Sequence, residues 1–330
     1  MKKTTKIKPK KTKKKSTKSP AQPKRNPYSH KGQNGRVLII GGSKEYTGAV
    51  IFAGKAALKS GCDLVTIAAP EKVAWAINSY IPDLMTRKIK GEYITERKVT
   101  EVFKLTDKID TILIGNGISL KSEGFVIKFV KKIKDQLKNK ELNLVLDADA
   151  IKVANSNDLY NTIITPHEQE FEIFLNNNNK RELIRKLLEL KLKIIKPKKT
   201  NKQTQKKPAK KDPENNPDDI IQLRAKLIQN NLKEFFENGN VILLKGKTDI
   251  IISKNKIFYN KTGNPSMTKG GTGDILAGLC AGYYSQTKDP FNSASLAAFS
   301  LGQIGDQMFK RYNYNYLTSD MLRRIKKLRK

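Results

Sequence analysis

Short runs of Ile, Val and Leu that alternate with helix-like stretches limit what this chain can fold into. The segment "GRVLIIGGS" (35–43) predicts a buried strand that enters a glycine turn. "GAVIFAGKAALKSGC" (48–62) predicts a helix of small residues that stops at Gly61, and "DLVTIAAP" (63–70) predicts a second strand. Strand, turn, helix and strand together have the size of one βαβ unit.

The same alternation continues along the chain to residue 263. We expect strands at 109–117 and 142–151, a helix at 121–139, and a strand and a helix in 161–175. A charged helix at 180–192, a helix with a glycine stop at 219–239 and three short strands in 240–263 follow. Apolar strands joined by helices predict an α/β fold with a mostly parallel sheet covered on both faces. Ligands of such sheets bind beyond the carboxyl ends of the strands, where the glycine and polar turns of this chain fall.

The net charge of +34 is typical of a nucleic-acid binder, but its distribution argues against that reading. Residues 1–25, 193–211 and 321–330 carry twelve, nine and six Lys or Arg and no acidic residue, so most of the excess charge lies outside the predicted fold. We expect 1–25 to be a disordered tail. A single domain then covers 26–320, with an exposed Lys-rich insertion at 193–218 and a basic helix end at 321–330.

Cys62 and Cys280 lie far apart in apolar surroundings and predict buried free thiols, which fit a reducing compartment. The N-terminus has no apolar signal, and no run of eighteen apolar residues exists. These features predict a cytoplasmic protein without a membrane partner.

The stretch "SMTKGGTGDILAGLCAG" (266–282) combines a glycine turn, an aspartate and the start of a helix. Backbone N–H groups of such a turn bind phosphate, because they point outward at the positive end of the helix dipole. Asp274 would then act as a base on a hydroxyl that is about to be phosphorylated. The residues alone also allow a tight turn in which Asp274 only caps the helix.

The chain resembles the NAD(P)H-hydrate dehydratases of the ribokinase-like superfamily. The resemblance rests on the glycine turn within "TGNPSMTKGGTGDILAG" and on stretches at 30–66, 114–118 ("IGNGI"), 146–151 ("LDADAI"), 164–171 ("ITPHEQEF") and 243–252 ("LLKGKTDIII"). It implies a ribokinase-like three-layer sandwich and a hydro-lyase that uses ADP or ATP. Such an enzyme phosphorylates the hydroxyl of hydrated NADH or NADPH and eliminates phosphate, which repairs the cofactor.

The resemblance also implies roles for individual residues. Positions that match substrate contacts of the family are Ala53, Gly117, His167 and Asp274. Positions that match its adenine nucleotide contacts are Lys245, Gly246, Lys247, Thr248, Asp249 and Gly273, and Asn264 is added as a phosphate contact. Mg²⁺ is expected with the ADP or ATP co-substrate, and the protein is expected to be a homo-oligomer such as a tetramer.

Several of these residues have simpler interpretations. His167 could be a polar loop residue and Lys245 a surface lysine. Asp147 and Asp149 could be metal ligands or helix caps, and Asn264 and Lys269 could belong to an ordinary loop. The lysine segments predict weak, sequence-independent polyanion binding.

The chain also departs from the family pattern. Asn116 replaces the proline of a Gly-Pro-Gly turn, and Glu168-Gln169 replaces a Pro-Gly pair. The alternative functions are a small-molecule kinase of the same superfamily, such as a thiazole or pyrimidine kinase, and a basic protein associated with nucleic acid.

Overall fold

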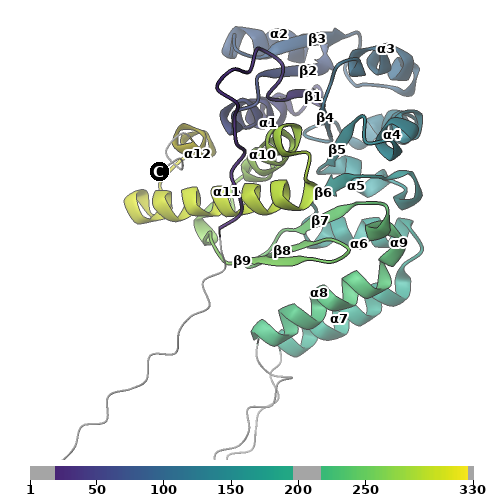
Figure 1. The fold of residues 1–330 in the computed structure, drawn as a ribbon, viewed down its shortest axis with the longest axis vertical. Coiled ribbons are helices and arrows are strands. Elements are labelled where there is room, and N and C mark those ends of the chain that lie inside the picture. The colour runs from purple at the N-terminus through teal and green to yellow at the C-terminus, as the bar shows by residue number, and fades with distance from the viewer. Residues whose placement is uncertain (1–18, 196–216, 326–330) are drawn as a thin grey trace, which may run out of the picture.

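The computed structural model describes residues 19–195 and 217–325 of the 330-residue chain, and its centre is a nine-stranded sheet (Figure 1). The strand order is β3-β2-β1-β4-β5-β6-β7-β8-β9. The strands are β1 (Arg36–Ile40), β2 (Leu64–Pro70), β3 (Met85–Ile89), β4 (Thr111–Ile114), β5 (Asn143–Leu146), β6 (Thr162–Ile164), β7 (Val241–Leu244), β8 (Asp249–Ile252) and β9 (Ile257–Asn260).

Most of the sheet is parallel, as predicted. All pairs from β3 across to β7 are parallel, whereas β7 pairs with β8 and β8 with β9 in antiparallel fashion. The connections 245–248 and 253–256 are too short for a crossover, so they join antiparallel neighbours. The three short strands predicted in 240–263 are therefore confirmed as an antiparallel end of the sheet.

Helices cover both faces of the sheet, which confirms the three-layer α/β sandwich. Alternate side chains of β1 enter two separate cores, with Val37 and Ile39 in one and Leu38 and Ile40 in the other. The first core is closed by α1 (Thr47–Ser60), α2 (Glu71–Tyr80), α10 (Thr272–Thr287), α11 (Pro290–Tyr312) and α12 (Thr318–Arg324). The second is closed by α3 (Val99–Phe103), α4 (Glu123–Lys138), α5 (Asp149–Val153), α6 (Glu168–Asn177), α7 (Arg181–Ile195), α8 (Pro217–Asn231) and α9 (Lys233–Glu237).

Helices α1 and α10 lie side by side and touch through their backbones (Figure 1). A side chain at Gly278 would collide with the carbonyl oxygen of Ala53, and one at Gly282 would collide with Ser60. The small residues of these two helices therefore allow the close approach. This packing places the first turn of α10 beside the loops that precede α1.

Some elements differ from the sequence prediction or were not part of it. The helix predicted at 219–239 is two helices, because Leu232 leaves helical geometry between α8 and α9 with φ −118° and ψ 36°. Neither α2 nor β3 was predicted; β3 is an edge strand of sequence MTRKI whose residues are mostly exposed. Cys62 and Cys280 are buried free thiols, as predicted.

Residues 19–25 of the predicted tail contact the domain. The Ala21 N–H donates to Asn292 Oδ1, and Asn292 Nδ2 donates to the carbonyl oxygen of Ala21. Arg25 forms an ion pair with Asp63 at 2.7 Å. The predictions for 1–18, 196–216 and 326–330 lie outside the described residues. Within residues 19–195 and 217–325, no helix has the length and apolar character needed to cross a bilayer.

Candidate active site

The carboxyl ends of five neighbouring strands meet the first turn of α10 at one edge of the sheet. β4 ends at the turn Gly115–Gly117, β5 at Asp147, β6 at the Thr165–His167 segment and β7 at Lys245. β1 ends at a glycine pair whose Gly42 N–H donates to the carbonyl oxygen of Asn116. Because these strands are parallel, their polar ends lie at the same edge, which is where the fold class predicts a ligand.

Asp274 lies in the first turn of α10 and faces Asn116. The Asn116 Nδ2 donates to Asp274 Oδ1 at 2.7 Å and to Asp147 Oδ2 at 3.0 Å. One amide group therefore joins two carboxylates from distant segments, one after β5 and one in α10.

Burial is the largest influence on the acidity of Asp274. It raises the pKa of this carboxyl, and the negative charge of Asp147 raises it further, while the Asn116 hydrogen bond and Lys245 act in the opposite direction; the result is a pKa of about 6. A carboxyl group that ionises near neutral pH has the acidity of an efficient general base.

Asp147 is 3% exposed and fully engaged by its neighbours. Its Oδ1 accepts from Thr165 Oγ1 at 2.7 Å and from Lys245 Nζ at 3.1 Å. Lys245 also lies 3.5 Å from Glu170 Oε2. Burial alone would lower the pKa of Lys245, but the charges of Asp147 and Glu170 outweigh this effect and raise it, so the lysine stays a cation.

The glycine turn before Asp274 presents unpaired backbone donors. Among the described residues, the N–H groups of Gly270, Gly271, Gly273 and Asp274 have no hydrogen-bond acceptor. Gly271 has φ +90°, and a side chain there would meet the ring of Phe52, so this position requires glycine. The Lys245 ammonium lies 3.6 Å from where a Cβ of Gly273 would stand. A cation and free N–H groups thus converge on one spot, which suits an anion.

His167 begins α6 as its N-cap. Its Nδ1 accepts from the backbone N–H groups of Gln169 and Glu170, and Glu170 Oε2 accepts from the His167 N–H at 2.8 Å. The ring is 48% exposed and its Nε2 lies 3.4 Å from Glu170 Oε1. His167 therefore has a structural role as a helix cap, and about half of its side chain is exposed.

The remaining predicted substrate positions lie around α1. Gly117 has φ +66° and adjoins Tyr46 and Ala49, so a side chain there would be crowded as well as strained. Ala53 is completely buried against Gly278, whereas Ala49, one turn earlier, is partly exposed beside Gly117.

The predicted nucleotide run forms the tight turn between β7 and β8. Gly246 N–H donates to Asp249 Oδ1 at 3.0 Å, and Asp249 Oδ2 accepts from Asn260. Burial raises the pKa of Asp249. Lys247 is exposed and Thr248 is partly exposed, so this turn offers a short open edge next to Lys245.

Asn264 and Lys269 are engaged in loop contacts. Asn264 Oδ1 accepts from Ser266, and its Nδ2 donates to Asp306 at 2.9 Å. Lys269 Nζ donates to the carbonyl oxygen of Tyr314. Both side chains hold the segment that precedes the glycine turn, and a phosphate contact by Asn264 stays a prediction.

The described residues do not form a protein cage for a metal ion. Within the two described ranges, no group of three or more His, Cys, Asp or Glu side chains could hold a metal. Asp149 pairs with Lys152 at 2.6 Å, and Asp147 is occupied as described above. Mg²⁺ often binds through one or two carboxylates and the phosphates of a substrate.

Three residues of this cluster were not predicted as site residues: Asn116, Thr165 and Glu170. Asn116 was noted only as a departure within a turn, although a polar residue between two glycines at a strand end is a signal for a ligand crevice. Glu170 is the third residue of α6, where an acidic side chain is expected to complete a helix cap. The ion pair between Glu170 and Lys245 joins residues 75 positions apart, so no local sequence pattern predicts it.

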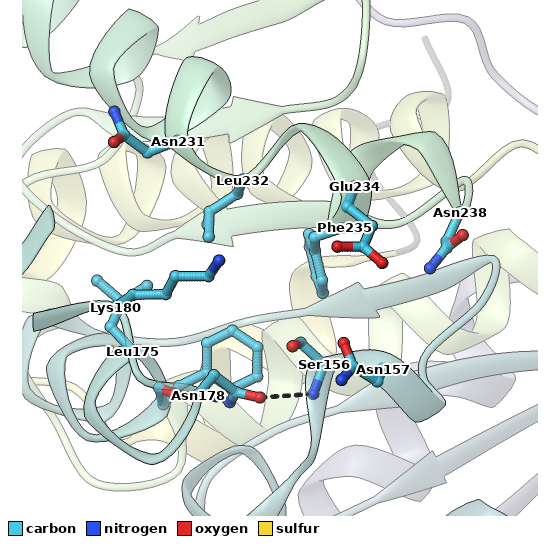
Figure 2. Close-up of a pocket in the computed structure, with 11 residues that line it drawn as sticks. Ser156, Asn157, Leu175, Asn178, Lys180, Asn231, Leu232, Glu234, Phe235 and Asn238 are labelled. Carbon is cyan, nitrogen blue, oxygen red and sulfur yellow. Dashed lines mark hydrogen bonds between the residues drawn. The ribbon is translucent and has the colours of Figure 1, made fainter.

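A separate cavity, drawn in Figure 2, lies away from this cluster. It has a volume of about 50 Å³ and is bordered by α6, α9 and the segment at Ser156, whose N–H donates to Asn178 Oδ1 at 2.7 Å. This space holds no more than a few water molecules, and none of the predicted site residues lines it.

Known proteins resemble this chain over nearly all of the described residues. The family model described as NAD(P)H-hydrate dehydratase matches residues 37–211 and 215–327. The bifunctional NAD(P)H-hydrate repair enzyme Nnr of Methanothermobacter thermautotrophicus is 36% identical over 91% of this chain and 50% of that protein. The ADP-dependent (S)-NAD(P)H-hydrate dehydratase of Nitrosopumilus maritimus is 31% identical over 92% and 91% of the two chains. The chain thus spans about half the length of the bifunctional relatives.

Solved structures show the same fold. A ribokinase-like superfamily protein from Enterococcus faecalis gives a TM-score of 0.68 at 23% identity and covers 93% of this chain and 90% of that one. The ADP/ATP-dependent NAD(P)H-hydrate dehydratase of Bacillus subtilis, co-crystallised with ATP and Mg²⁺, gives 0.63 at 22% identity and covers 93% and 94%. The expectation of a ribokinase-like sandwich is therefore confirmed.

Proposed function

This chain belongs to the NAD(P)H-hydrate dehydratase family, and from that premise we propose that it dehydrates the S form of hydrated NADH or NADPH at the expense of ADP or ATP. One observation carries the proposal. Asp274, with a pKa of about 6, directly follows the glycine turn, in which the N–H groups of Gly270, Gly271 and Gly273 have no acceptor among the described residues; the Lys245 ammonium lies beside this turn. A base and an anion-binding site therefore adjoin each other, as phosphoryl transfer to a hydroxyl requires.

The reaction has two parts. Asp274 takes the proton of the hydroxyl on carbon 6 of the nicotinamide ring while the oxygen attacks the terminal phosphoryl group, and the shortened nucleotide leaves. The lone pair of the ring nitrogen then expels phosphate as the carbon–oxygen bond breaks. Loss of a proton from carbon 5 restores the ring double bond. Phosphorylation is needed because hydroxide is a poor leaving group and phosphate is a good one.

The surrounding residues have defined tasks in this scheme. The unpaired N–H groups of Gly270, Gly271 and Gly273 stabilise charge on the transferring phosphoryl group, as preorganised dipoles do. Lys245 and the 246–249 turn bind the nucleotide, and Gly117 and His167 orient the nicotinamide. Mg²⁺ bound to the nucleotide phosphates would neutralise part of their charge. Asp147 serves to fix Lys245.

The partners are the hydrated cofactor and the adenine nucleotide. The relative from Nitrosopumilus maritimus is named ADP-dependent, so ADP is the first nucleotide to test. Binding of polyanions by the lysine-rich segments, assembly into a homo-oligomer and a cytoplasmic location are proposals that rest on charge and on the family.

The test is a dehydration assay. Hydrated NADH is incubated with the intact chain and either ADP or ATP, and the return of absorbance at 340 nm is followed. We expect turnover with at least one nucleotide and a loss of about 10²- to 10⁴-fold for Asp274→Asn. No return of absorbance with either nucleotide would refute the proposal. Near-normal turnover by Asp274→Asn would show that this aspartate is not the base.

A further inference from the structure

Asn116 lies between the two buried carboxylates of the site. It is 0% exposed, and its Nδ2 donates one hydrogen to Asp147 and the other to Asp274. The opposite amide orientation would turn the carbonyl oxygen toward two carboxylates, so the observed orientation is the only favourable one. Among the described residues, Asn116 Oδ1 is buried without a partner, which leaves the two carboxylates as the contacts that orient the amide.

We propose that Asn116 is the positioning residue of this site: its amide holds Asp274 through Oδ1 and leaves Oδ2 free for the hydroxyl of the substrate. This inference rests on the proposed function, in which Asp274 is the base. No hydrogen bond reaches Asp274 Oδ2 from any described residue. The carboxylate is thus fixed on one side and open on the other.

The anchor of this arrangement is rigid. Asp147, which receives the second hydrogen of the amide, is itself bound by Thr165 and Lys245. A continuous path of hydrogen bonds therefore runs from the nucleotide-binding lysine through Asp147 and Asn116 to the base. A carboxylate held within such a network spends most of its time in the orientation that the reaction requires.

The charges around Asp274 explain why a neutral donor is needed there. Asp147 and Glu170 are negative and Lys245 is positive, and all three influence the acidity of Asp274. Without the amide, two carboxylates would face each other and one of them would hold its proton to higher pH. The proline that the family pattern has at this position carries no donor, so the asparagine of this chain adds a function to the turn.

The principal test is Asn116→Leu, a change of similar size that removes both donors. We expect kcat near pH 7 to fall about 10- to 100-fold, because a hydrogen bond to a charged group is lost. We also expect the acid limb of the pH profile of kcat to move up by about one pH unit, while KM for the nucleotide stays unchanged.

A second variant guards against misfolding. Asn116→Pro restores the residue of the family turn, and the backbone N–H of Asn116 has no acceptor among the described residues, so the turn loses no hydrogen bond. We expect the same shift of the acid limb. The matched control is Asn143→Leu, which removes a buried amide whose partner is Thr111. It should lower the melting temperature and leave the pH profile unchanged.

A measurement without substrate separates this inference from the proposed function. The Asp274 carboxyl is titrated by carbon-13 NMR in the wild-type chain and in both Asn116 variants. A higher pKa in the variants supports the inference, even if the chain dehydrates no hydrate, in which case the proposed function alone fails. An unchanged pKa of Asp274 in both variants would overturn the inference, whether or not the chain dehydrates the hydrate.

Discussion

Lys245 Nζ lies 3.1 Å from Asp147 Oδ1, although the two residues are 98 positions apart and follow different strands. The lysine cation also approaches Glu170 and the glycine turn. It therefore neutralises two buried acids and at the same time presents positive charge to an anion.

Replacement of this lysine should affect stability and binding together. In Lys245→Met, Asp147 and Glu170 stay buried without their cation, which should lower the free energy of unfolding by about 1–3 kcal/mol. Nucleotide affinity should fall more than tenfold. Chemical denaturation and calorimetric titration with ADP measure the two effects. Lys254→Met, which removes an exposed lysine paired with Glu237, should change neither; equal behaviour of the two variants would refute the role given to Lys245.

Asp274 should make stability depend on pH. The pKa of Asp274 rises on folding, so the folded state binds the proton more tightly than the unfolded state does. The stability that the chain gains from this difference is fully present below about pH 4. It is lost as the pH rises through about 6, where the carboxyl ionises in the folded chain. Asp274→Asn, which cannot ionise, should therefore melt at a higher temperature than the wild type at pH 7.5 and at the same temperature near pH 4. A difference that does not vary with pH would contradict the raised pKa.

His167 should have two separable roles. His167→Ala removes both the helix cap and the proposed substrate contact, so we expect a loss of stability of about 1 kcal/mol and weaker binding of the hydrate than of ADP. His167→Asn supplies a good cap, so it should restore the melting temperature but leave hydrate binding weak. If the asparagine variant regained full affinity for the hydrate, the ring would have no direct role in substrate binding.

The contact between α1 and α10 should tolerate no added methyl group. Gly278→Ala should lower the free energy of unfolding by about 1–3 kcal/mol, because the new Cβ meets the backbone of Ala53. Gly48→Ala is the matched control: it lies near the start of α1, and a Cβ there would meet no atom within 4 Å. Denaturant titrations of both variants give the comparison, and equal stability would show that the two helices can separate without cost.

The sequence predicts the parallel part of the fold because its strands are continuous apolar runs bounded by glycine, proline or polar residues. It does not predict β3, since an exposed edge strand such as MTRKI lacks that signature. It also gives no sign of the break at Leu232, because the helical pattern of the sequence continues across this non-helical residue.

The candidate site could be predicted only in part for a related reason. Asp274 and the glycine turn are local features, and the chain carries them in one short stretch. The partnership of Asn116 with Asp274 spans 158 positions and exists only through the packing of α10 against the sheet. A resemblance to a family predicts roles only for residues that match the family motifs. Asn116 departs from its motif, so the resemblance predicts no role for it.

The glycine turn has a further support that affects how the protein forms in the cell. Thr318, the first residue of α12, donates from its hydroxyl to the carbonyl oxygen of Gly270, 48 positions earlier. During translation, the ribosome releases Gly270 well before Thr318, so the turn lacks this hydrogen bond until α12 has emerged. A nascent chain would therefore hold the glycine turn less firmly until α12 packs against it, so the order of this turn depends on a helix that is synthesised later.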